Sequence, residues 1–370
     1  MSKKIGIITY HHTINYGATL QSYGLYTFLI NLGYEVELID YISDEISWED
    51  RKFLYFSKYN FLHPYMIIKG LNRRTKMNNF LNKNLKRSQK RFFNEHELKI
   101  YSHSYDIIIC GSDEIWNIAH RKFDKSYFID FLNDQKVKKI SYAASFGSTN
   151  CIDNYKAEIS ILLKNFSSLS VRDNNSLSLV EQCGIGAKVQ KVLDPTFLIS
   201  HKDYKNISKK PDVKNPYILI YGQLSSKEVE CIKYIAKKIK LDIVSIGTKQ
   251  DSLRIITKSN VFDVSPEYWL GFFIHADLIV TKFYHGVIFS IIFNKPFVFF
   301  DSPAKSLKVK DLLRTLKLED RIVDCHEFET DIDKNDENWI LTSPLSKQTQ
   351  KNIIEEQIKS SQDFLFRSLQ

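Results

Sequence analysis

Short apolar runs alternate along the chain with longer segments that have a helical pattern. The chain begins with an apolar run at residues 4–10, a helical segment at 17–33 and a second apolar run at 34–42. A strand, a helix and a strand in this order form a βαβ unit, because two parallel strands need a crossover connection. The pattern therefore predicts a parallel sheet that is covered by helices.

Further apolar runs extend this first series. Short buried strands are predicted within residues 105–114, 138–145, 168–173 and 189–199. A helix is predicted over residues 174–184, where the pattern ends at a glycine. The first series thus contains enough strands for a sheet of its own.

A polar, Lys-rich stretch with two prolines, residues 201–216, is the predicted linker. A second alternating series of apolar and helical segments starts at residue 217. Two such series predict an α/β protein with two Rossmann-like domains that face one another across a cleft. The expected boundaries are residues 1–200 for the first domain and 217–330 for the second, followed by a helical tail at 331–370.

Composition agrees with a two-domain globular protein. The chain has 370 residues, and a single hydrophobic core rarely grows beyond about 250–300 residues. No apolar stretch reaches the roughly 18 residues of a membrane span, and the N-terminus lacks a signal-peptide pattern, so a cytoplasmic location is expected. The five cysteines are widely spread and lack metal-binding spacing, so we expect reduced thiols and no metal site.

Basic residues concentrate in one segment. Residues 51–100 hold thirteen Lys and Arg but only two acids, Glu95 and Glu97, whereas the net charge of the whole chain is +9. The segment is also aromatic and helix-forming, which predicts a basic helical insertion in the first domain. It is either a solvated face or a surface for peripheral contact with an anionic membrane leaflet. Nucleic acid is not an expected partner, because no recognition motif accompanies the charge.

Ligands of open parallel sheets bind beyond the carboxyl ends of the strands, where loops and helix N-termini converge. Two loops of the first series carry polar residues at such positions. In the first loop, Asn15 and Gly17 either cap a helix or approach a ligand. The second loop either caps a helix or meets the hydroxyls and ring faces of a sugar, and its polar residues are Ser112, Asp113, Glu114, Trp116 and Asn117.

Two further loops carry cations. Arg172 ends a predicted strand, and its planar guanidinium suits either a neighbouring carboxylate or the phosphate or carboxylate of a ligand. Lys282, His285 and Gly286 lie where a buried strand turns into a buried helix. A lone histidine is more often structural than catalytic, but Lys282 at the same strand end strengthens the case for function.

The order of these segments resembles the polysaccharide pyruvyl transferase family. The matching segments are colinear from residue 4 to about residue 323: IGIITYHHTINYGATLQSYGLYTFLINLGYEVELIDY, YDIIICGSDEIWN, ISYAASFG, LSVRD, VLDPTFLI, SPEYWLGFFIHADLIVTKFYHGVIFSIIFNKPFV and VKDLLRTLKLEDRIV. The resemblance implies two Rossmann-like domains of the glycosyltransferase B type. It also implies transfer of the pyruvyl unit of phosphoenolpyruvate to two hydroxyls of a sugar, with formation of a cyclic ketal and release of phosphate. Phosphoenolpyruvate is a co-substrate, and no metal or other cofactor is implied.

The resemblance suggests a role for each cationic loop. His285 is the candidate acid/base, and Arg172 is the candidate clamp for the phosphate or carboxylate of phosphoenolpyruvate. Where many relatives have Ser-Phe-His-Gly or Arg-Leu-His-Gly, this chain has Phe-Tyr-His-Gly at residues 283–286, so the arginine that some members use is absent. Lys282 and Lys308 are the expected substitutes in donor binding, together with Gly286.

The acceptor is expected to contact the other two loops, which contain Asn15 and Gly17 and residues 112–117. Glu114 stands where the family usually has glutamine, and it adds a charge to this loop. The expected acceptor is a sugar in a surface polysaccharide or exopolysaccharide precursor, and a lipid-linked oligosaccharide would fit peripheral membrane contact. Two alternatives stay open: a glycosyltransferase that uses a nucleotide-sugar donor, and a non-catalytic carbohydrate-binding relative.

Overall fold

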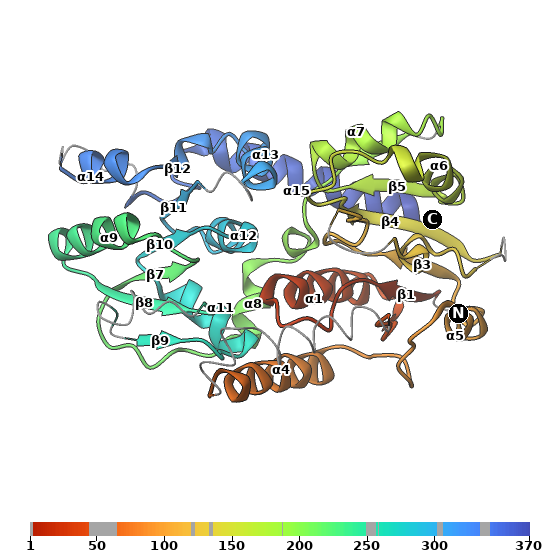
Figure 1. Cartoon of the computed structure of the whole chain (residues 1–370), viewed down its shortest axis with the longest axis horizontal. Coiled ribbons are helices and arrows are strands. Elements are labelled where there is room, and N and C mark those ends of the chain that lie inside the picture. The colour runs from red at the N-terminus through yellow and green to blue at the C-terminus, as the bar shows by residue number, and fades with distance from the viewer. Residues whose placement is uncertain are drawn as a thin grey trace. The chain divides into compact units, whose positions relative to one another are not determined.

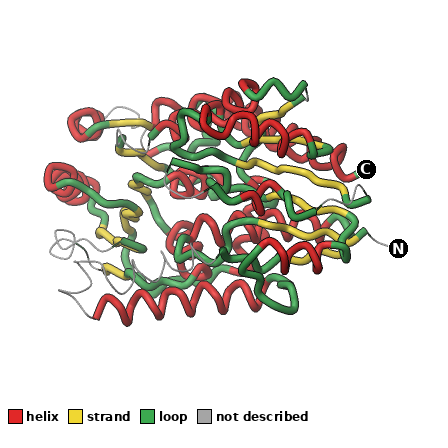
Figure 2. The backbone as a smooth tube through the Cα atoms, turned by 45° about the vertical axis from the view of Figure 1, so that its right-hand side comes forward, coloured by secondary structure: helices red, strands yellow, loops and turns green. Residues whose placement is uncertain are grey.

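The structure is a computed structural model that describes residues 3–43, 65–119, 123–132, 136–186, 188–248, 257, 259–301, 306–333 and 341–370. The chain divides into two compact units. The first comprises Met1–Gly70, Met77–Ile199 and Gln357–Gln370, and the second comprises Leu71–Lys76 and Ser200–Glu356. Strands and helices are combined in both units, as Figures 1 and 2 show.

A six-stranded parallel sheet forms the centre of the first unit, with the order β2-β1-β3-β4-β5-β6. Its strands are β1 (Lys4–Ile8), β2 (Glu35–Leu38), β3 (Ile107–Cys110), β4 (Lys138–Ala144), β5 (Ser168–Val171) and β6 (Val189–Lys191). The chain goes from β1 to β2 on one side and then to β3 on the other, so the order reverses at β1. Such a switch point is where ligands of open sheets bind.

Helices cover both faces of this sheet, and most of the strand residues are therefore buried. The helices are α1 (Tyr16–Asn31), α4 (Tyr65–Asn84), α5 (Glu95–Ser102), α6 (Lys156–Lys164), α7 (Asn174–Gln182) and α15 (Gln348–Leu369). The rings of Phe28 in α1 and Phe366 in α15 lie 5.8 Å apart between centroids. Leu98 of α5 and Leu162 of α6 instead belong to a core cluster with Ile108 of β3.

The second unit repeats this plan with a six-stranded parallel sheet in the order β12-β11-β10-β7-β8-β9. Its strands are β7 (Tyr217–Tyr221), β8 (Asp242–Ile246), β9 (Ser259–Val261), β10 (Leu278–Thr281), β11 (Phe297–Phe300) and β12 (Ile322–Val323). Here the order reverses at β7, between β8 and β10, so this unit has a switch point of its own.

Helices also cover both faces of the second sheet. They are α8 (His201–Ile207), α9 (Ser226–Ile239), α11 (Pro266–His275), α12 (Tyr284–Ile292), α13 (Leu307–Thr315) and α14 (Cys325–Asp333). Figure 1 shows α9 and α14 on one side of the strands and α11, α12 and α13 on the other. Trp269 of α11 packs edge-on against Phe289 of α12, with 5.1 Å between ring centroids. Short 3₁₀ helices complete the two units: η1 (Lys125–Phe128), η2 (Asp153–Tyr155), η3 (Pro195–Phe197) and η4 (Glu319–Arg321).

The two predicted series of strands are confirmed, but the connections differ from the sequence prediction. Residues 201–216 start with helix α8, which Ser200 and Asp203 cap reciprocally, and they belong to the second unit. The end of the predicted helical tail, Gln357–Gln370, belongs to the first unit. There Lys3 Nζ donates a hydrogen bond to the Leu369 carbonyl oxygen at 3.0 Å.

Helix α4 accounts for much of the predicted basic insertion, whereas residues 51–64 lie outside the described residues. Leu71–Lys76 of this helix belong to the second unit. Arg73 is buried and donates to the Gly247 carbonyl oxygen at 2.8 Å, and Lys76 donates to the Asp263 carbonyl oxygen at 2.6 Å. The insertion was predicted to lie in the first domain, whereas the structure divides it between the two units. Among the helices that the structure describes, none is both long and apolar enough to cross a membrane.

Candidate active site

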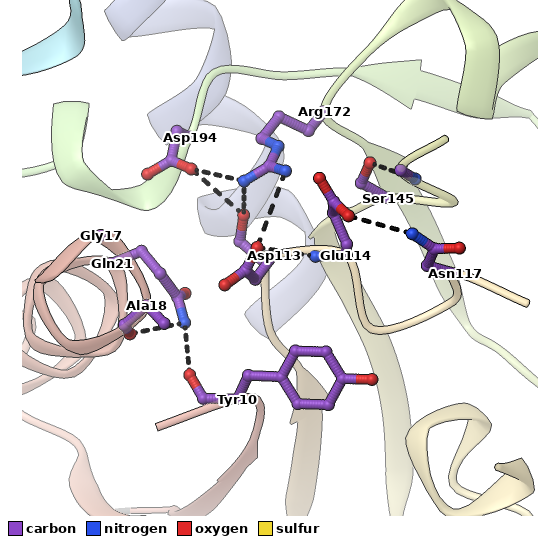
Figure 3. Close-up of polar contacts among 12 residues, drawn as sticks. Tyr10, Gly17, Ala18, Gln21, Asp113, Glu114, Asn117, Ser145, Arg172 and Asp194 are labelled. Atoms are coloured by element: carbon purple, nitrogen blue, oxygen red, sulfur yellow. Dashed lines mark hydrogen bonds and ion pairs between the residues drawn. The ribbon is translucent and has the colours of Figure 1, made fainter. Parts of the chain in front are cut away.

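Three loops meet at the carboxyl edge of the first sheet, because the carboxyl ends of parallel strands lie at the same edge. Arg172 follows β5, Asp194 follows β6 and Ser112 follows β3. Arg172 Nη1 lies 3.0 Å from Asp194 Oδ2 and 3.5 Å from Ser112 Oγ (Figure 3). The structure thus brings Arg172 and Ser112, both predicted as site residues, into direct contact.

Arg172 and Asp194 form a buried ion pair. The side chain of Arg172 is 1% exposed and that of Asp194 is 0% exposed. Asp194 Oδ1 also accepts hydrogen bonds from the backbone N and the hydroxyl of Thr196, which fixes the turn before η3. Of the two roles that the sequence left open for Arg172, the structure shows the contact with a neighbouring carboxylate.

Asp194 is the partner of a predicted site residue, and the sequence prediction did not single it out. The available signal was the Asp-Pro pair at residues 194–195, which directly follows the last strand of the first series. An aspartate before a proline is typical of a turn. The signal did not show that its partner is Arg172, which is 22 residues away in the sequence.

Asp113 lies beside this pair in a strained backbone conformation. Its φ of +81° is in the left-handed region, which is uncommon for residues other than glycine. The Asp113 carbonyl oxygen accepts a hydrogen bond from Ser145 N at 3.2 Å, which holds the strained residue against the end of β4. Asp113 Oδ1 lies 3.9 Å from Arg172 Nη2, and the side chain is 14% exposed. Strain of this kind clusters at functional sites.

Glu114 and Asn117 form a polar pair at the same loop. Asn117 Nδ2 donates to Glu114 Oε2 at 3.0 Å, and Asn117 Oδ1 accepts from the hydroxyl of Thr149. Gly147 lies so close that a Cβ atom at this position would be 2.6 Å from both Glu114 Oε2 and Asn117 Nδ2. The glycine therefore leaves room for the pair, which is partly exposed at Glu114.

Trp116 lies in the core and does not face an acceptor. Its indole is 1% exposed, stacks on Phe128 at 4.9 Å between centroids and donates its N–H to the Tyr127 carbonyl oxygen at 3.1 Å. The sequence prediction that this ring meets a sugar is therefore wrong, because the ring stacks on Phe128 and its N–H already donates to Tyr127. Asn15 shows the simpler of its two predicted roles, since its Oδ1 caps α1 by accepting from Gly17 N at 2.9 Å.

In the second unit, the loop between β10 and α12 is held by Thr281. Its hydroxyl donates to the Tyr221 carbonyl oxygen at 2.7 Å and accepts from Phe283 N at 3.1 Å. A Cβ atom on Gly286 would lie 2.1 Å from Thr281 Oγ1, so only glycine fits at this point of α12. Burial raises the pKa of Tyr221 to about 12, so its phenol stays protonated beside the loop.

His285 is in the first turn of α12 and is 8% exposed. Its ring lies edge-on to Tyr284, with 5.3 Å between centroids. Lys308 Nζ lies 5.6 Å from the centre of the Tyr284 ring, which is within cation–π range. Tyr284 thus has the ring of His285 at one edge and the ammonium of Lys308 near its ring, at the start of α12.

Lys282 forms an ion pair that the sequence did not predict. Its Nζ lies 2.7 Å from Oε1 and 3.0 Å from Oε2 of Glu228. Glu228 also caps α9, since it accepts from Ser225 N while Ser225 accepts from Glu228 N. The charge of Lys282 is therefore balanced within the protein. Within the described ranges, no cluster of three or more His, Cys, Asp or Glu is arranged to hold a metal ion.

Solved structures with a similar fold include UDP-GlcNAc 2-epimerases and a protein solved with UDP. UDP-GlcNAc 2-epimerase from Methanocaldococcus jannaschii is 11% identical with a TM-score of 0.52, over 91% of this chain and 94% of that one. The co-structure of Staphylococcus aureus MnaA with UDP is 10% identical with a TM-score of 0.51, over 98% and 97%. A putative UDP-N-acetylglucosamine 2-epimerase from Listeria monocytogenes is 9% identical with a TM-score of 0.50, over 92% and 90%. These similarities show the fold, which is two Rossmann-like domains of the glycosyltransferase B type.

The sequence comparison assigns the chain to a narrower class of proteins than the fold does. The family model of the polysaccharide pyruvyl transferases matches residues 15–303, which is well over half of the chain. The chain therefore belongs to the polysaccharide pyruvyl transferase family. A search of the curated proteins found no match.

Proposed function

We propose that the protein transfers the pyruvyl unit of phosphoenolpyruvate to two hydroxyls of a sugar in a surface polysaccharide or exopolysaccharide precursor. The product is a cyclic ketal, and phosphate is released. The observation that carries the proposal is the family match, because it includes the loops with Asp113, Arg172 and His285. Arg172 and His285 are buried, and a backbone hydrogen bond holds Asp113 at the end of β4. Such a fixed setting is what pre-organised acid–base and electrostatic catalysis requires.

The reaction sets the chemistry that the protein must supply. The methylene carbon of phosphoenolpyruvate gains a proton and becomes a methyl group, which makes C2 electrophilic. C2 then forms bonds to two sugar oxygens and loses its bond to the phosphate oxygen. Of the two hydroxyl protons, one balances the proton taken up by the methyl group and the other leaves with phosphate. An acid, a base and fixed positive charge are therefore needed.

His285 is the proposed acid/base of this reaction. It starts a buried helix behind a loop that Thr281 fixes, so its ring has little freedom. Lys308 supplies positive charge nearby through its position over Tyr284. Lys282 supplies less, because Glu228 balances it.

Arg172 is the proposed contact for the negative charge of the donor. The ion pair with Asp194 holds its guanidinium in one orientation, and Nη2 is the nitrogen that faces Asp113. Asp113, Glu114 and Asn117 are the proposed acceptor contacts, because their polar groups surround the exposed part of the same loop. A lipid-linked oligosaccharide is the proposed acceptor, and the protein would then act in the cytoplasm with peripheral contact to the membrane.

Release of inorganic phosphate from phosphoenolpyruvate, measured with and without a galactosyl or mannosyl acceptor, tests the proposal. Acceptor-dependent release supports pyruvyl transfer. Release of a nucleoside diphosphate from a nucleotide sugar, with phosphoenolpyruvate left intact, would show a glycosyltransferase. Sugar binding without either release would show a carbohydrate-binding protein.

A further inference from the structure

A second polar cluster lies at the carboxyl ends of β1 and β2, separate from the residues assigned above. Asp40 follows β2 and accepts hydrogen bonds from Arg91 Nε at 3.1 Å and from Arg91 Nη2 at 3.2 Å. His11 follows β1, and its Nε2 lies 3.0 Å from Asp40 Oδ1. Arg87 Nη1 lies 3.4 Å from Asp40 Oδ2. We call these four residues the Asp40 cluster.

The end of the basic segment is what brings the two arginines to this place. Residues 86–92 run beside β2, with parallel bridges that pair Leu38 with Arg87 and Tyr41 with Phe92. Phe92 N donates to the Asp40 carbonyl oxygen at 2.8 Å. The segment therefore extends along the edge strand β2 and places its two arginines at the carboxyl end of the sheet, where ligands of open parallel sheets bind.

The cluster has more positive than negative charge. Both arginines are permanently charged, and the other contacts of Arg87 are to the neutral amide oxygens of Asn78 and Asn82. The ring of His11 is 0% exposed, and its Nδ1 lies 2.9 Å from the Thr9 carbonyl oxygen. Both ring nitrogens of His11 thus face oxygen atoms. Among the permanently charged groups, one carboxylate faces two guanidinium cations.

Asp40 itself stays ionised in this setting. Burial alone would raise its pKa, but the hydrogen bonds and charges of His11 and Arg91 outweigh burial and hold the pKa well below its ordinary value. The carboxylate therefore cancels only one of the two arginine charges. The remaining excess is what an anionic ligand would balance.

The cluster is open to a ligand and is linked to the proposed acceptor loop. The side chains of Arg91 and Arg87 are 37% and 17% exposed, so each of them reaches solvent in part. Thr9 connects the Asp40 cluster to the loop that contains Ser112. Its carbonyl oxygen faces His11, and its hydroxyl donates to the Ser112 carbonyl oxygen at 2.7 Å. A sugar at the Ser112 loop could thus carry an attached anionic group toward the Asp40 cluster.

We propose that the Asp40 cluster binds the phosphate or diphosphate group of the sugar acceptor. This inference rests on the proposed function, which supplies the sugar acceptor. Two arginine forks match the geometry of phosphate oxygens, and the excess of positive charge favours an anionic group. The cluster thereby selects acceptors that are still attached to a phosphorylated carrier over free neutral sugars.

Binding of inorganic pyrophosphate, measured by calorimetry at low salt, tests the site without any need for activity. Arg91→Gln should weaken binding at least about tenfold, because it removes a charged fork. Asp40→Asn should strengthen binding, because it removes the carboxylate that competes for the arginines. Lys90→Gln is the matched control, since Lys90 is 60% exposed and lies near Glu97, and it should change little. Melting curves establish that each variant is folded, and Arg87→Gln replaces Arg91→Gln if the latter is not.

The proposal is overturned if the wild type does not bind pyrophosphate, if Arg91→Gln binds as well as the wild type, or if Asp40→Asn binds more weakly. The last result would mean that Asp40 only maintains the structure of the loop. Steady-state kinetics then separate the two sources of phosphate. Arg91→Gln should raise the KM for a phosphorylated acceptor about tenfold and leave the KM for phosphoenolpyruvate and for the dephosphorylated acceptor unchanged.

A rise in the KM for phosphoenolpyruvate instead would assign the cluster to the donor and contradict the acceptor role. Failure of the proposed function has a different signature. In that case the wild type would release no phosphate from phosphoenolpyruvate. The pyrophosphate measurements would still show whether the Asp40 cluster binds an anion, because they do not depend on activity.

Discussion

Two ion pairs hold the loops that carry the proposed chemistry: Arg172 with Asp194 and Lys282 with Glu228. The first pair is almost fully buried, so removal of one partner would leave an unbalanced charge at a cost of about 3–5 kcal/mol. Substitutions at this pair therefore report on function only if they keep the charge.

Arg172→Lys is such a substitution. It keeps a positive charge beside Asp194 but loses the planar fork whose Nη2 faces Asp113. We expect the KM for phosphoenolpyruvate to rise more than the KM for the sugar, as measured by phosphate release at varied concentrations of each substrate. An unchanged KM for phosphoenolpyruvate would show that the pair is only structural.

His285→Ala should reduce kcat by about 10²-fold or more, because general acid–base catalysis contributes at least this much. The melting temperature should change little if the ring serves chemistry and not packing. His275→Ala is a suitable control, since His275 is an exposed histidine in the last turn of α11. A large drop in melting temperature with a proportionate loss of activity in His285→Ala would indicate a structural histidine.

The sequence predicted several loop residues that the structure brings together, such as Arg172 and Ser112, but it did not predict their partners. Arg172 and Ser112 were predicted because polar residues at strand ends are visible in the local pattern. Asp194 and Glu228 were missed as partners, because ion pairs between residues far apart in sequence leave no local signal. Trp116 was assigned wrongly for the related reason that a single sequence does not show which way an aromatic ring at a loop points.

At the level of elements, the start of α9 and the end of β10 are coupled. Glu228 closes the capping box of α9 with Ser225 and also binds Lys282, which follows β10. One carboxylate thus stabilises a helix N-terminus and neutralises a cation of the proposed donor site. A substitution can separate these two roles of Glu228. A neutral side chain at this position can still cap α9, but it cannot neutralise the charge of Lys282.

Glu228→Gln should therefore lower the KM for phosphoenolpyruvate by a few fold, because it releases the charge of Lys282 while glutamine still accepts the capping hydrogen bond. The melting temperature should change only slightly. Glu230→Gln in the same helix is the control, since Glu230 is 70% exposed and contacts Lys233. An unchanged KM in Glu228→Gln would exclude Lys282 from donor binding.

Local patterns predicted the strands well and the connections less well. The runs at residues 4–10 and 105–114 became β1 and β3, because apolar runs bounded by turn residues are typical of buried parallel strands. Residues 201–216 contain helix α8 despite their polar composition, and the signal was the Ser-x-x-Asp capping pattern at Ser200 and Asp203. The return of α15 to the first unit is a tertiary contact that no local pattern contains.

For the whole molecule, the net charge of +9 raises the question of membrane contact. Arg73 is buried, and Arg87 and Arg91 are paired with Asp40, so these three contribute less charge to a lipid surface than the sequence suggested. If peripheral contact occurs, exposed lysines of the segment must provide it, at about 1 kcal/mol each.

Co-sedimentation with vesicles of graded anionic lipid content measures this contact. The triple variant Lys83→Gln, Lys90→Gln and Lys99→Gln should lose binding that the wild type shows and that salt weakens. A control with the same charge change elsewhere, Lys202→Gln, Lys205→Gln and Lys237→Gln, should retain it. If wild type and both variants fail to sediment, the segment is a solvated face.

The most direct test of pyruvyl transfer is the structure of the product formed from phosphoenolpyruvate and a galactosyl or mannosyl acceptor. Proton NMR and mass spectrometry of the purified acceptor should show one added pyruvyl ketal, with a methyl signal that arises from the protonated methylene carbon. The product should form with the wild type and should form about 10²-fold or more slowly with His285→Ala. An unmodified acceptor after complete incubation of the active, folded wild type with both substrates would contradict the proposed reaction.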